Sequence, residues 1–341
     1  MGISRLRFLG VAIATLLVLT ACGSSPGTTK VIKVGLVTDT GGLNDKSFNH
    51  LADVGLEKAK TEFHVQGDVV ESHSGGDYIP NLTHFASLNY DLVIGVGFLM
   101  AEAVGTVSGT FPNIHFAIID GAGTDAKGND LKHPNVQSLF FKEQDAGAMV
   151  GVIAGMLEKN SKAPKNNHVI SAVGGISIPP VNHYIAGYKW AAKMEDPSIK
   201  VLVGYSNDFS DPAKCKGVAN SQIAQKSDIL FQVAGGCGLG VLQAAGQAKV
   251  FSIGVDADQK DADASVIASA LKKVDVATYT AIKNVVNGQF QGGALTFSLA
   301  NDGAGYALDN LTLPADIQTE LDSVKAKIAS GALTPPADIP A

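Results

Sequence analysis

VIKVGLVTDTGGLNDKSFNHLADVGLEKAKTE, residues 31–62, is the stretch that decides the fold class. It opens with an apolar run from Val31 to Thr38, continues with a polar, glycine-rich loop, and ends in an amphipathic segment from Ser47 to Glu62. The apolar run is continuous rather than alternating, which predicts a parallel strand buried on both faces. A strand, a loop and a helix in this order predict an α/β fold built from βαβ units.

The same alternation continues along the chain in two series. The first series has further predicted strands at 65–72, 92–97, 114–120 and 136–141, with a helical pattern at 79–88 between two of them. The second has predicted strands at 169–174, 201–206, 229–233, 250–255 and 266–271, and helical patterns at 181–193, 212–225 and 239–248. A chain of 341 residues is long enough for two domains. We therefore expect two parallel sheets of about five strands each.

The first residues carry the pattern of an export signal. Arg5 and Arg7 precede an apolar run at 8–19, which is too short for a comfortable membrane-spanning helix. The sequence Leu-Thr-Ala-Cys ending at Cys22 is similar to a bacterial lipoprotein processing site. We expect a signal peptide at 1–21, a lipidated Cys22 and a flexible tether at 22–30. An ordinary signal peptide, in which Cys22 is incidental, is the alternative.

Composition and motifs exclude several functions. The formal net charge is −6, which argues against a nucleic-acid partner because phosphate binding needs a basic surface. No GxSxG, HExxH or CxxC motif is present. His50 and His183 fall near loops of interest, but a lone histidine is more often a supporting residue than a catalytic base. We expect no enzyme, no metal and no cofactor.

Short polar residues and glycines follow the predicted strands. In parallel sheets ligands bind beyond the carboxyl ends of the strands, so these loops are candidate binding segments. Their composition suits a neutral polyol or amide ligand better than a phosphate. The segments are DTGGLNDKSFN at 39–49, Asp120-Gly121, GGISIPP at 174–180, SNDFSDP at 206–212, AGGCGLG at 234–240 and DADQ at 256–259.

Six of the chain's motifs, taken in order, resemble the basic membrane protein family. They are GGLNDKSFN (41–49), FAIIDG (116–121), GGISIPPV (174–181), NDFSDPAK (207–214), AGGCGLGV (234–241) and IGVDADQ (253–259). The family consists of lipid-anchored substrate-binding proteins of ABC transporters and includes purine-nucleoside receptors. The resemblance implies a type I periplasmic-binding-protein fold, in which two Rossmann-like lobes are joined by a three-crossing hinge and close around a ligand.

The resemblance also implies how the chain divides between the lobes. The first lobe would comprise 31–140 and about 269–291, and the second 141–268 and about 292–341. The crossings would fall after Phe140, near Ala268 and near Gln291. The helix at 274–286 would then belong to the first lobe and a strand at 294–300 to the second.

By the same resemblance, Asn44 and Asp45 would hydrogen-bond a base, although either could simply cap a helix. Asp120 and Asp256 would accept hydrogen bonds from sugar hydroxyls, with turn chemistry as the alternative. Lys272 would neutralise charge or donate a hydrogen bond nearby.

Three further positions concern the ligand ring. Phe209 would stack on it. Gly235 and Gly236 would bring backbone close to the ligand, or would serve a turn at the start of a helix.

One position departs from the family pattern. Five residues after Phe48, where the family commonly has a second stacking aromatic, this chain has Asp53. A one-sided stack would lose roughly 0.5 to 1.5 kcal/mol. Asp53 could face solvent or bond a ligand donor. The expected ligand is nucleoside-like, and a free purine base, a sugar or polyol, or a riboflavin-like ring is the alternative.

Cys215 and Cys237 remain after Cys22 is set aside. Cys237 lies at a helix start, where a reactive thiolate is favoured. Cys215 lies near the start of another helix after a neighbouring strand, and an exported protein is in a compartment that permits disulfides. We therefore predict a Cys215–Cys237 disulfide rather than nucleophilic chemistry.

These observations together predict a monomeric receptor, lipid-anchored on the extracytoplasmic face of the cell membrane. It would capture a small molecule and deliver it to an ABC permease. A ligand sensor of the same fold is the alternative.

Overall fold

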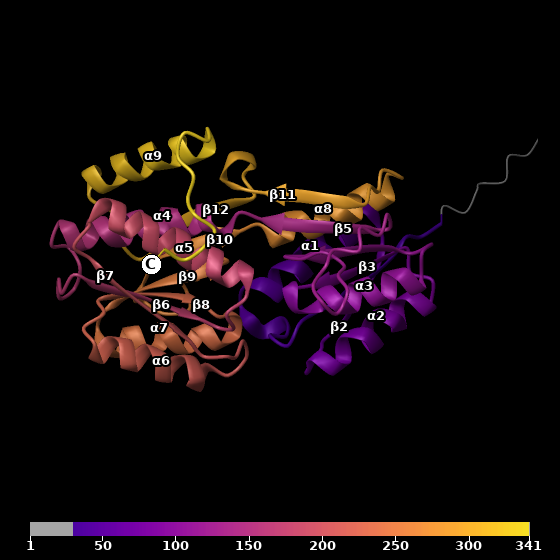
Figure 1. Cartoon of the computed structure of the whole chain (residues 1–341), viewed down its shortest axis with the longest axis horizontal. Helices are drawn as coiled ribbons and strands as arrows, with labels where there is room; N and C mark the ends of the chain where they lie inside the picture. Colours follow the sequence, from indigo (N-terminus) through magenta and orange to yellow (C-terminus); the bar gives the residue numbers. More distant parts are fainter. Residues whose placement is uncertain (1–29, 341) are drawn as a thin grey trace, which may run out of the picture. The chain divides into compact units, whose positions relative to one another are not determined.

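The computed structural model describes residues 30–340 of the chain. The predicted signal peptide, the lipidated Cys22 and nearly all of the tether lie outside these residues. Within the described part, the strands form two sheets with helices on both faces of each (Figure 1). The α/β class and the two parallel-dominated sheets expected from the sequence are confirmed.

The first sheet has the strand order β11-β5-β4-β3-β1-β2 in the described chain, with every pair parallel. Two cores cover its faces: one contains residues of α1 and α8, the other residues of α2 and α3. The strands are β1 (Lys33–Val37), β2 (Gln66–Val70), β3 (Leu92–Val96), β4 (His115–Ile119), β5 (Val136–Phe141) and β11 (Gly293–Phe297). The helices are α1 (Phe48–Phe63), α2 (Tyr78–Ser87), α3 (Ala101–Thr110) and α8 (Val274–Val286).

The second sheet has the order β12-β10-β9-β8-β6-β7 over the described residues, and β12 alone of these is antiparallel to its neighbour. Helices α4, α5 and α9 contribute to one core, and α6 and α7 to the other. The strands are β6 (Val169–Gly174), β7 (Lys200–Tyr205), β8 (Ile229–Val233), β9 (Phe251–Asp256), β10 (Val266–Lys272) and β12 (Ala304–Leu308). The helices are α4 (Glu143–Lys159), α5 (Pro179–Glu195), α6 (Pro212–Ala224), α7 (Leu239–Ala248) and α9 (Ala315–Ala329).

Within residues 30–340 the chain passes between the two lobes three times: from β5 to α4, from β10 to α8, and from β11 to β12. Helix α8 packs against α1, and in Figure 1 the orange α8 and β11 lie among the indigo and purple elements of the first lobe. The second crossing follows Lys272 rather than Ala268, because β10 continues to Lys272.

The placement of one strand from the sequence is wrong. The strand expected at 294–300 in the second lobe is β11, and it pairs with β5 in the first sheet. The cause is local packing, since Phe297 stacks on Phe141 with ring centroids 5.0 Å apart and belongs to the first lobe's core. The third crossing therefore comes after Phe297 rather than near Gln291.

A seam of glycines sets how closely α4 and α5 pack. A Cβ added at Gly147 or Gly151 would collide with the backbone carbonyl of Tyr184 or Tyr188. A Cβ added at Gly187 would collide with the carbonyl of Gln144. The close approach of the two helices fixes the position of α5, whose first turns face the cleft.

The two cysteines of the second lobe form the predicted disulfide. Cys215 lies in α6, and Cys237 lies in the short 3-10 helix η4 (Gly235–Gly238). Both are fully buried in the core contributed by α6 and α7. The bond ties the glycine loop after β8 to a neighbouring helix, and it leaves no free thiol for nucleophilic chemistry at Cys237.

Candidate functional site

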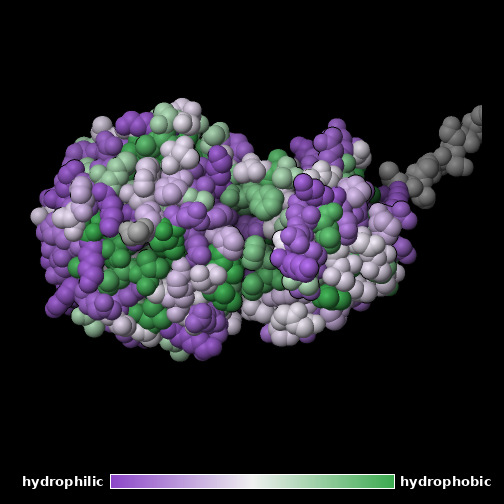
Figure 2. Space-filling view, in the orientation of Figure 1, coloured by the Kyte–Doolittle hydropathy of each residue, from purple (hydrophilic) through white to green (hydrophobic). Residues whose placement is uncertain are grey.

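A cavity lies between the lobes, at the carboxyl ends of strands from both sheets. The empty space between its walls, with the part open to solvent included, is about 540 Å³. Apolar residues gather where the lobes meet on the face shown in Figure 2. The lining residues are Asp39, Gly41, Asp45, Phe48, Asn49, Gly97, Phe98, Asp120, Ile178, Pro180, Val181, Tyr184, Phe209, Val233, Ala234, Gly235, Val255, Asp256 and Lys272.

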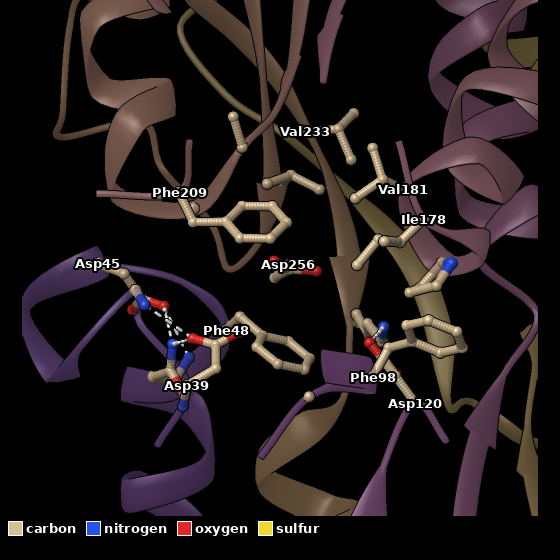
Figure 3. A pocket seen from close by; sticks show the side chains of 18 of the residues that line it. Asp39, Asp45, Phe48, Phe98, Asp120, Ile178, Val181, Phe209, Val233 and Asp256 are labelled. Carbon is tan, nitrogen blue, oxygen red and sulfur yellow. Dashed lines mark hydrogen bonds and ion pairs between the residues drawn. The ribbon is translucent and has the colours of Figure 1, made fainter. Parts of the chain in front are cut away.

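Two aromatic rings face the cavity from opposite lobes. Phe48 is the first residue of α1, and Phe209 lies in the loop between β7 and α6 (Figure 3). Phe98, in the short 3-10 helix η3 (Phe98–Met100), adds a third ring to the lining. A flat ring held between phenyl groups gains contact on both of its faces.

The structure corrects the expectation for Asp53. Asp53 does not line the cavity, and Phe48 supplies the aromatic ring of the first lobe that the sequence appeared to lack. Asp53 is half-buried on α1. Burial raises the pKa of Asp53, the charge of Glu57 raises it further, and His50 and Lys60 oppose the rise. Asp53 is therefore not in place to bond a ligand donor in this cavity, whereas Phe48 is in place to contact a ligand.

Asp45 lines the cavity, but its carboxylate caps α1. Its Oδ1 accepts hydrogen bonds from the backbone N–H groups of Ser47 (2.9 Å) and His50 (3.1 Å). Its Oδ2 accepts from the backbone N–H of Asn49 (2.7 Å) and from the Asn49 side chain (3.2 Å). Asn44 is exposed and does not line the cavity. The helix-capping alternative thus accounts for Asp45.

Asp39 is a lining residue to which sequence reasoning assigned no role. It lies two residues after the end of β1, so its position beyond a parallel strand was the available signal. Its Oδ1 accepts from the backbone N–H of Gly41 (2.9 Å) and from Asn49 Nδ2 (2.8 Å). Burial raises the pKa of Asp39 to about 6. The second oxygen of Asp39, Oδ2, lies against Gly97, which has a φ of 117°. A Cβ added at Gly97 would lie only 3.0 Å from Oδ2, so the glycine leaves room for this oxygen.

Asp120 and Asp256 occupy matching places in the two lobes. Asp120 follows β4, Asp256 ends β9, and both have left-handed backbone with φ of 67° and 62°. Aspartate adopts this conformation more readily than most residues other than glycine. Asp256 Oδ1 accepts from the Tyr184 hydroxyl at 3.0 Å, and burial raises the pKa of Asp256 to about 6. Asp120 Oδ1 is buried without a hydrogen-bond partner among the described residues.

Lys272 is the cation of the cavity wall. Its Nζ donates to Asp120 Oδ2 (2.6 Å) and to Glu143 Oε1 (2.9 Å), and its side chain is 2% exposed. Burial alone lowers the pKa of Lys272, but the attraction of Asp120 and Glu143 outweighs burial and raises it. Burial raises the pKa of Asp120, and Lys272 opposes that rise. The ammonium group therefore stays charged and holds one oxygen of Asp120.

The lobes touch at the glycine loop and at the mouth of the cleft. Gly235 lines the cavity with φ of 55°, and a Cβ added at Gly236 would lie 3.5 Å from the Cα of Asp45 in the first lobe. Gln259 Nε2 donates to the Lys46 carbonyl at 3.4 Å. The absence of a side chain at Gly235 lets its backbone line the cavity, and the absence of one at Gly236 lets its backbone approach the first lobe.

The cavity combines apolar walls with an excess of acceptors. Among the described lining residues, aspartates outnumber the single lysine, and Ile178, Val181 and Val233 form an apolar side (Figure 3). This arrangement suits an uncharged ring that carries hydroxyl or amino donors and disfavours a phosphate. No cluster of His, Cys, Asp or Glu suited to a metal occurs among the described residues.

Comparison with known proteins decides the family. The model of the Bmp family, described as "ABC transporter substrate-binding protein PnrA-like", matches residues 32–337. The chain belongs to the Bmp family. This finding confirms the resemblance read from the six motifs, and it makes the protein a substrate-binding protein of the ABC-transporter class.

Bmp relatives agree over nearly the whole chain. The chain is 31% identical over 355 residues to the "ABC transporter nucleoside-binding protein BmpA" of Lactococcus lactis, covering 96% of this chain and 97% of that protein. It is 33% identical over 309 residues to an uncharacterized lipoprotein of Pyrococcus horikoshii, covering 87% and 74%. A solved structure of an ABC transporter solute-binding protein from Aeropyrum pernix superposes with a TM-score of 0.81 at 29% identity, covering 90% and 94%. The type I periplasmic-binding fold is confirmed.

Proposed function

We propose that this Bmp protein is a nucleoside receptor that delivers its ligand to an ABC permease. The observation that carries the proposal is the facing pair Phe48 and Phe209, which fits a planar base between two phenyl rings. Asp120 and Asp256 supply acceptors for the hydroxyls of a sugar attached to that base. The Lactococcus relative, which is named as nucleoside-binding, supports the same ligand class.

The mechanism is capture by closure, with no covalent step. A ligand that contacts Phe48 in one lobe and Phe209 in the other stabilises the closed arrangement over the open one. Apolar walls exclude water from the base, and the acceptors select ligands with donors. The excess of carboxylates opposes phosphate, so nucleotides are expected to bind more weakly than nucleosides.

The proposal also covers the location. The sequence pattern at Cys22 and the lipoprotein name of the Pyrococcus relative support a lipid anchor on the outer face of the cell membrane. None of the helices within residues 30–340 has the length and apolar character needed to cross a bilayer. A Cys22→Ala variant should move from the membrane fraction to the soluble fraction, whereas continued membrane association would contradict lipidation at this residue.

A thermal-shift screen followed by calorimetry tests the ligand class. The panel contains purine and pyrimidine nucleosides, free bases, pentoses, polyols, riboflavin and nucleoside monophosphates. A ligand at about 100 times its Kd stabilises the protein by roughly 2.7 kcal/mol. Stabilisation by nucleosides and not by monophosphates supports the proposal. Stabilisation by pentoses or polyols alone would replace it with sugar binding.

A further inference from the structure

The ion cluster at the cavity wall continues outward past the residues that line it. Glu143 does not line the cavity, and its side chain is buried behind the cavity wall with 2% of its surface exposed. Its Oε1 accepts from Lys272 Nζ, and its Oε2 lies 3.0 Å from Nδ1 of His183. His183 is 30% exposed. An unbroken series of contacts thus runs from the cavity through Asp120, Lys272 and Glu143 to a histidine that reaches solvent.

These residues come from segments that meet at the hinge. Glu143 begins α4 directly after the first crossing, and Lys272 ends β10 directly before the second. Asp120 follows β4 in the first lobe. His183 lies in the first turns of α5, beside the lining residues Val181 and Tyr184. The cluster therefore links the floor of the cleft to two of the connections between the lobes.

Both oxygens of Glu143 are engaged, and this fixes its carboxylate group. The terminal torsion of a glutamate side chain is intrinsically broad, so contacts rather than rotamer preference must set it. A hydrogen bond from His183 to Oε2 holds the plane of the carboxylate and so keeps Oε1 directed at Lys272. The position of the ammonium group in turn determines which oxygen of Asp120 is occupied and which one stays free.

We propose that Glu143 and His183 are positioning residues for ligand specificity. Together they hold Lys272, and through it Asp120, so that the unpartnered Oδ1 of Asp120 is available to a ligand hydroxyl. The inference rests on the proposed function, because it takes the ligand to be a nucleoside whose sugar donates to Asp120. Neither residue contacts the ligand in this scheme.

Four variants test the role. His183→Leu removes the donor, whereas His183→Asn keeps an amide nitrogen close to the position of Nδ1. Glu143→Gln removes the charge and keeps the shape. His168→Leu is the matched control, because His168 Nδ1 pairs with Asp196 Oδ2 at 2.8 Å in the same lobe, at the start of β6. His168 and Asp196 do not line the cavity.

Calorimetry with a nucleoside and its 2′-deoxy and 3′-deoxy counterparts gives the readout. The wild type should prefer the ligand with the hydroxyl by about 10- to 100-fold, the range of a hydrogen bond to a charged group. His183→Leu and Glu143→Gln should lose most of that preference, with little change in Kd for the deoxy ligand. His183→Asn and His168→Leu should keep it.

If the two residues have only a general structural role, their variants should weaken the binding of all these ligands alike. That result would overturn the inference, and so would an unchanged preference for the hydroxyl in His183→Leu and Glu143→Gln. If the wild type binds no nucleoside, the proposed function fails, and the positioning role is then tested without ligand. The ¹⁵N signal of the buried Lys272 ammonium should shift in His183→Leu and Glu143→Gln but not in His183→Asn or His168→Leu. An unmoved signal in the first two would overturn the inference independently of the ligand.

Discussion

At the residue scale, the aspartates of the cleft differ in how many hydrogen bonds they already accept. Asp45 accepts from backbone and side-chain donors on both of its oxygens and serves the helix. Asp39 uses one oxygen for Gly41 and Asn49. Asp120 has a buried oxygen without a partner in the described chain. The unused oxygens, rather than the number of carboxylates, indicate which aspartates are available to a ligand.

Asp39 predicts a pH dependence of stability in the ligand-free protein. Burial raises its pKa from 3.8 to about 6, so the folded state binds more protons than the unfolded state between these values. The free energy of unfolding should therefore fall as pH rises from about 4 to 6 and level off above that. Asp39→Asn should lack this component and be about 1 to 3 kcal/mol more stable than the wild type at pH 7.5.

Urea unfolding at pH 4.5 and pH 7.5 measures this effect. Asp322→Asn, at an exposed carboxylate on α9, serves as the control and should change neither value. If Asp39→Asn is less stable than the wild type at pH 7.5, the hydrogen bonds to Asp39 outweigh the cost of burying its charge.

The two phenyl rings predict a second result. Phe48→Ala and Phe209→Ala should each weaken nucleoside binding by about two- to twelve-fold, through loss of aromatic contact on one face of the base. Asp53→Ala should leave Kd unchanged, because Asp53 lies off the cavity. Calorimetry on the three variants measures these changes in Kd. A larger loss of affinity in Asp53→Ala than in Phe48→Ala would support the sequence-based expectation that Asp53 contacts the ligand.

Sequence reasoning located most of the polar site but not the first-lobe aromatic. Asp120, Phe209 and Asp256 lie in the family motifs and Lys272 was assigned from the same resemblance, and all of them line the cavity. Phe48 was missed because a residue's direction on a helix depends on where the helix begins. Phe48 is the first residue of α1, and a position five residues later points about 140° away from it on a helix of 3.6 residues per turn.

At the scale of elements, the seam between α4 and α5 positions one wall of the cleft. Gly187→Ala should destabilise the protein by about 1 to 3 kcal/mol, because the new methyl group meets the Gln144 carbonyl. Gly217→Ala is the matched control: it lies exposed in α6 with no atom within 4 Å of the added Cβ. That change should stabilise by about 0.5 to 1 kcal/mol. In urea unfolding, Gly187→Ala should have a lower midpoint than the wild type and Gly217→Ala a higher one. Equal midpoints for the two variants would refute the argument.

The disulfide gives a further prediction for this lobe. Cys215 and Cys237 are 22 residues apart in sequence, and a cross-link closing such a loop stabilises by about 3 kcal/mol in the chain-entropy account. The Cys215→Ala/Cys237→Ala double variant should lose about 2 to 4 kcal/mol in urea unfolding. The wild-type protein with its disulfide reduced should lose a similar amount of unfolding free energy as the double variant. An unchanged midpoint in both would mean that the buried surroundings alone hold η4 in place.

The buried parallel strands and the edge strands β2 and β7 were predictable, whereas the pairing of β11 and the existence of β12 at the opposite edges were not. β3 is a continuous apolar run and β8 is one interrupted only by Gln232, and each is buried along its full length. β11 lies at an edge, with Gly293 and Ala294 exposed, so its sequence says little about which sheet it joins. β12, also at an edge, has no long apolar run and was not expected. Pairing at an edge depends on tertiary contacts such as the stack of Phe297 on Phe141.

At the scale of the whole molecule, the contacts across the mouth predict a ligand-dependent shape. Gln259 reaches the Lys46 carbonyl, and Gly236 approaches Asp45, only when the lobes are together. Without ligand these contacts must hold the closed arrangement alone, so we expect a wider population of open states. Small-angle scattering should show a smaller radius of gyration with saturating nucleoside than without it. Superimposable curves would argue against closure on binding.

The route of the chain between the lobes also sets the order in which they can be completed during synthesis. Helix α8 and strand β11 belong to the first lobe but follow nearly all of the second lobe's sheet in sequence. A nascent chain that has reached Phe141 has β1 to β5 but lacks the helix that covers α1 and the strand that pairs with β5. The lobe that leaves the ribosome first is therefore finished only when residue 297 has emerged, so for most of its translation the chain carries an incomplete first lobe.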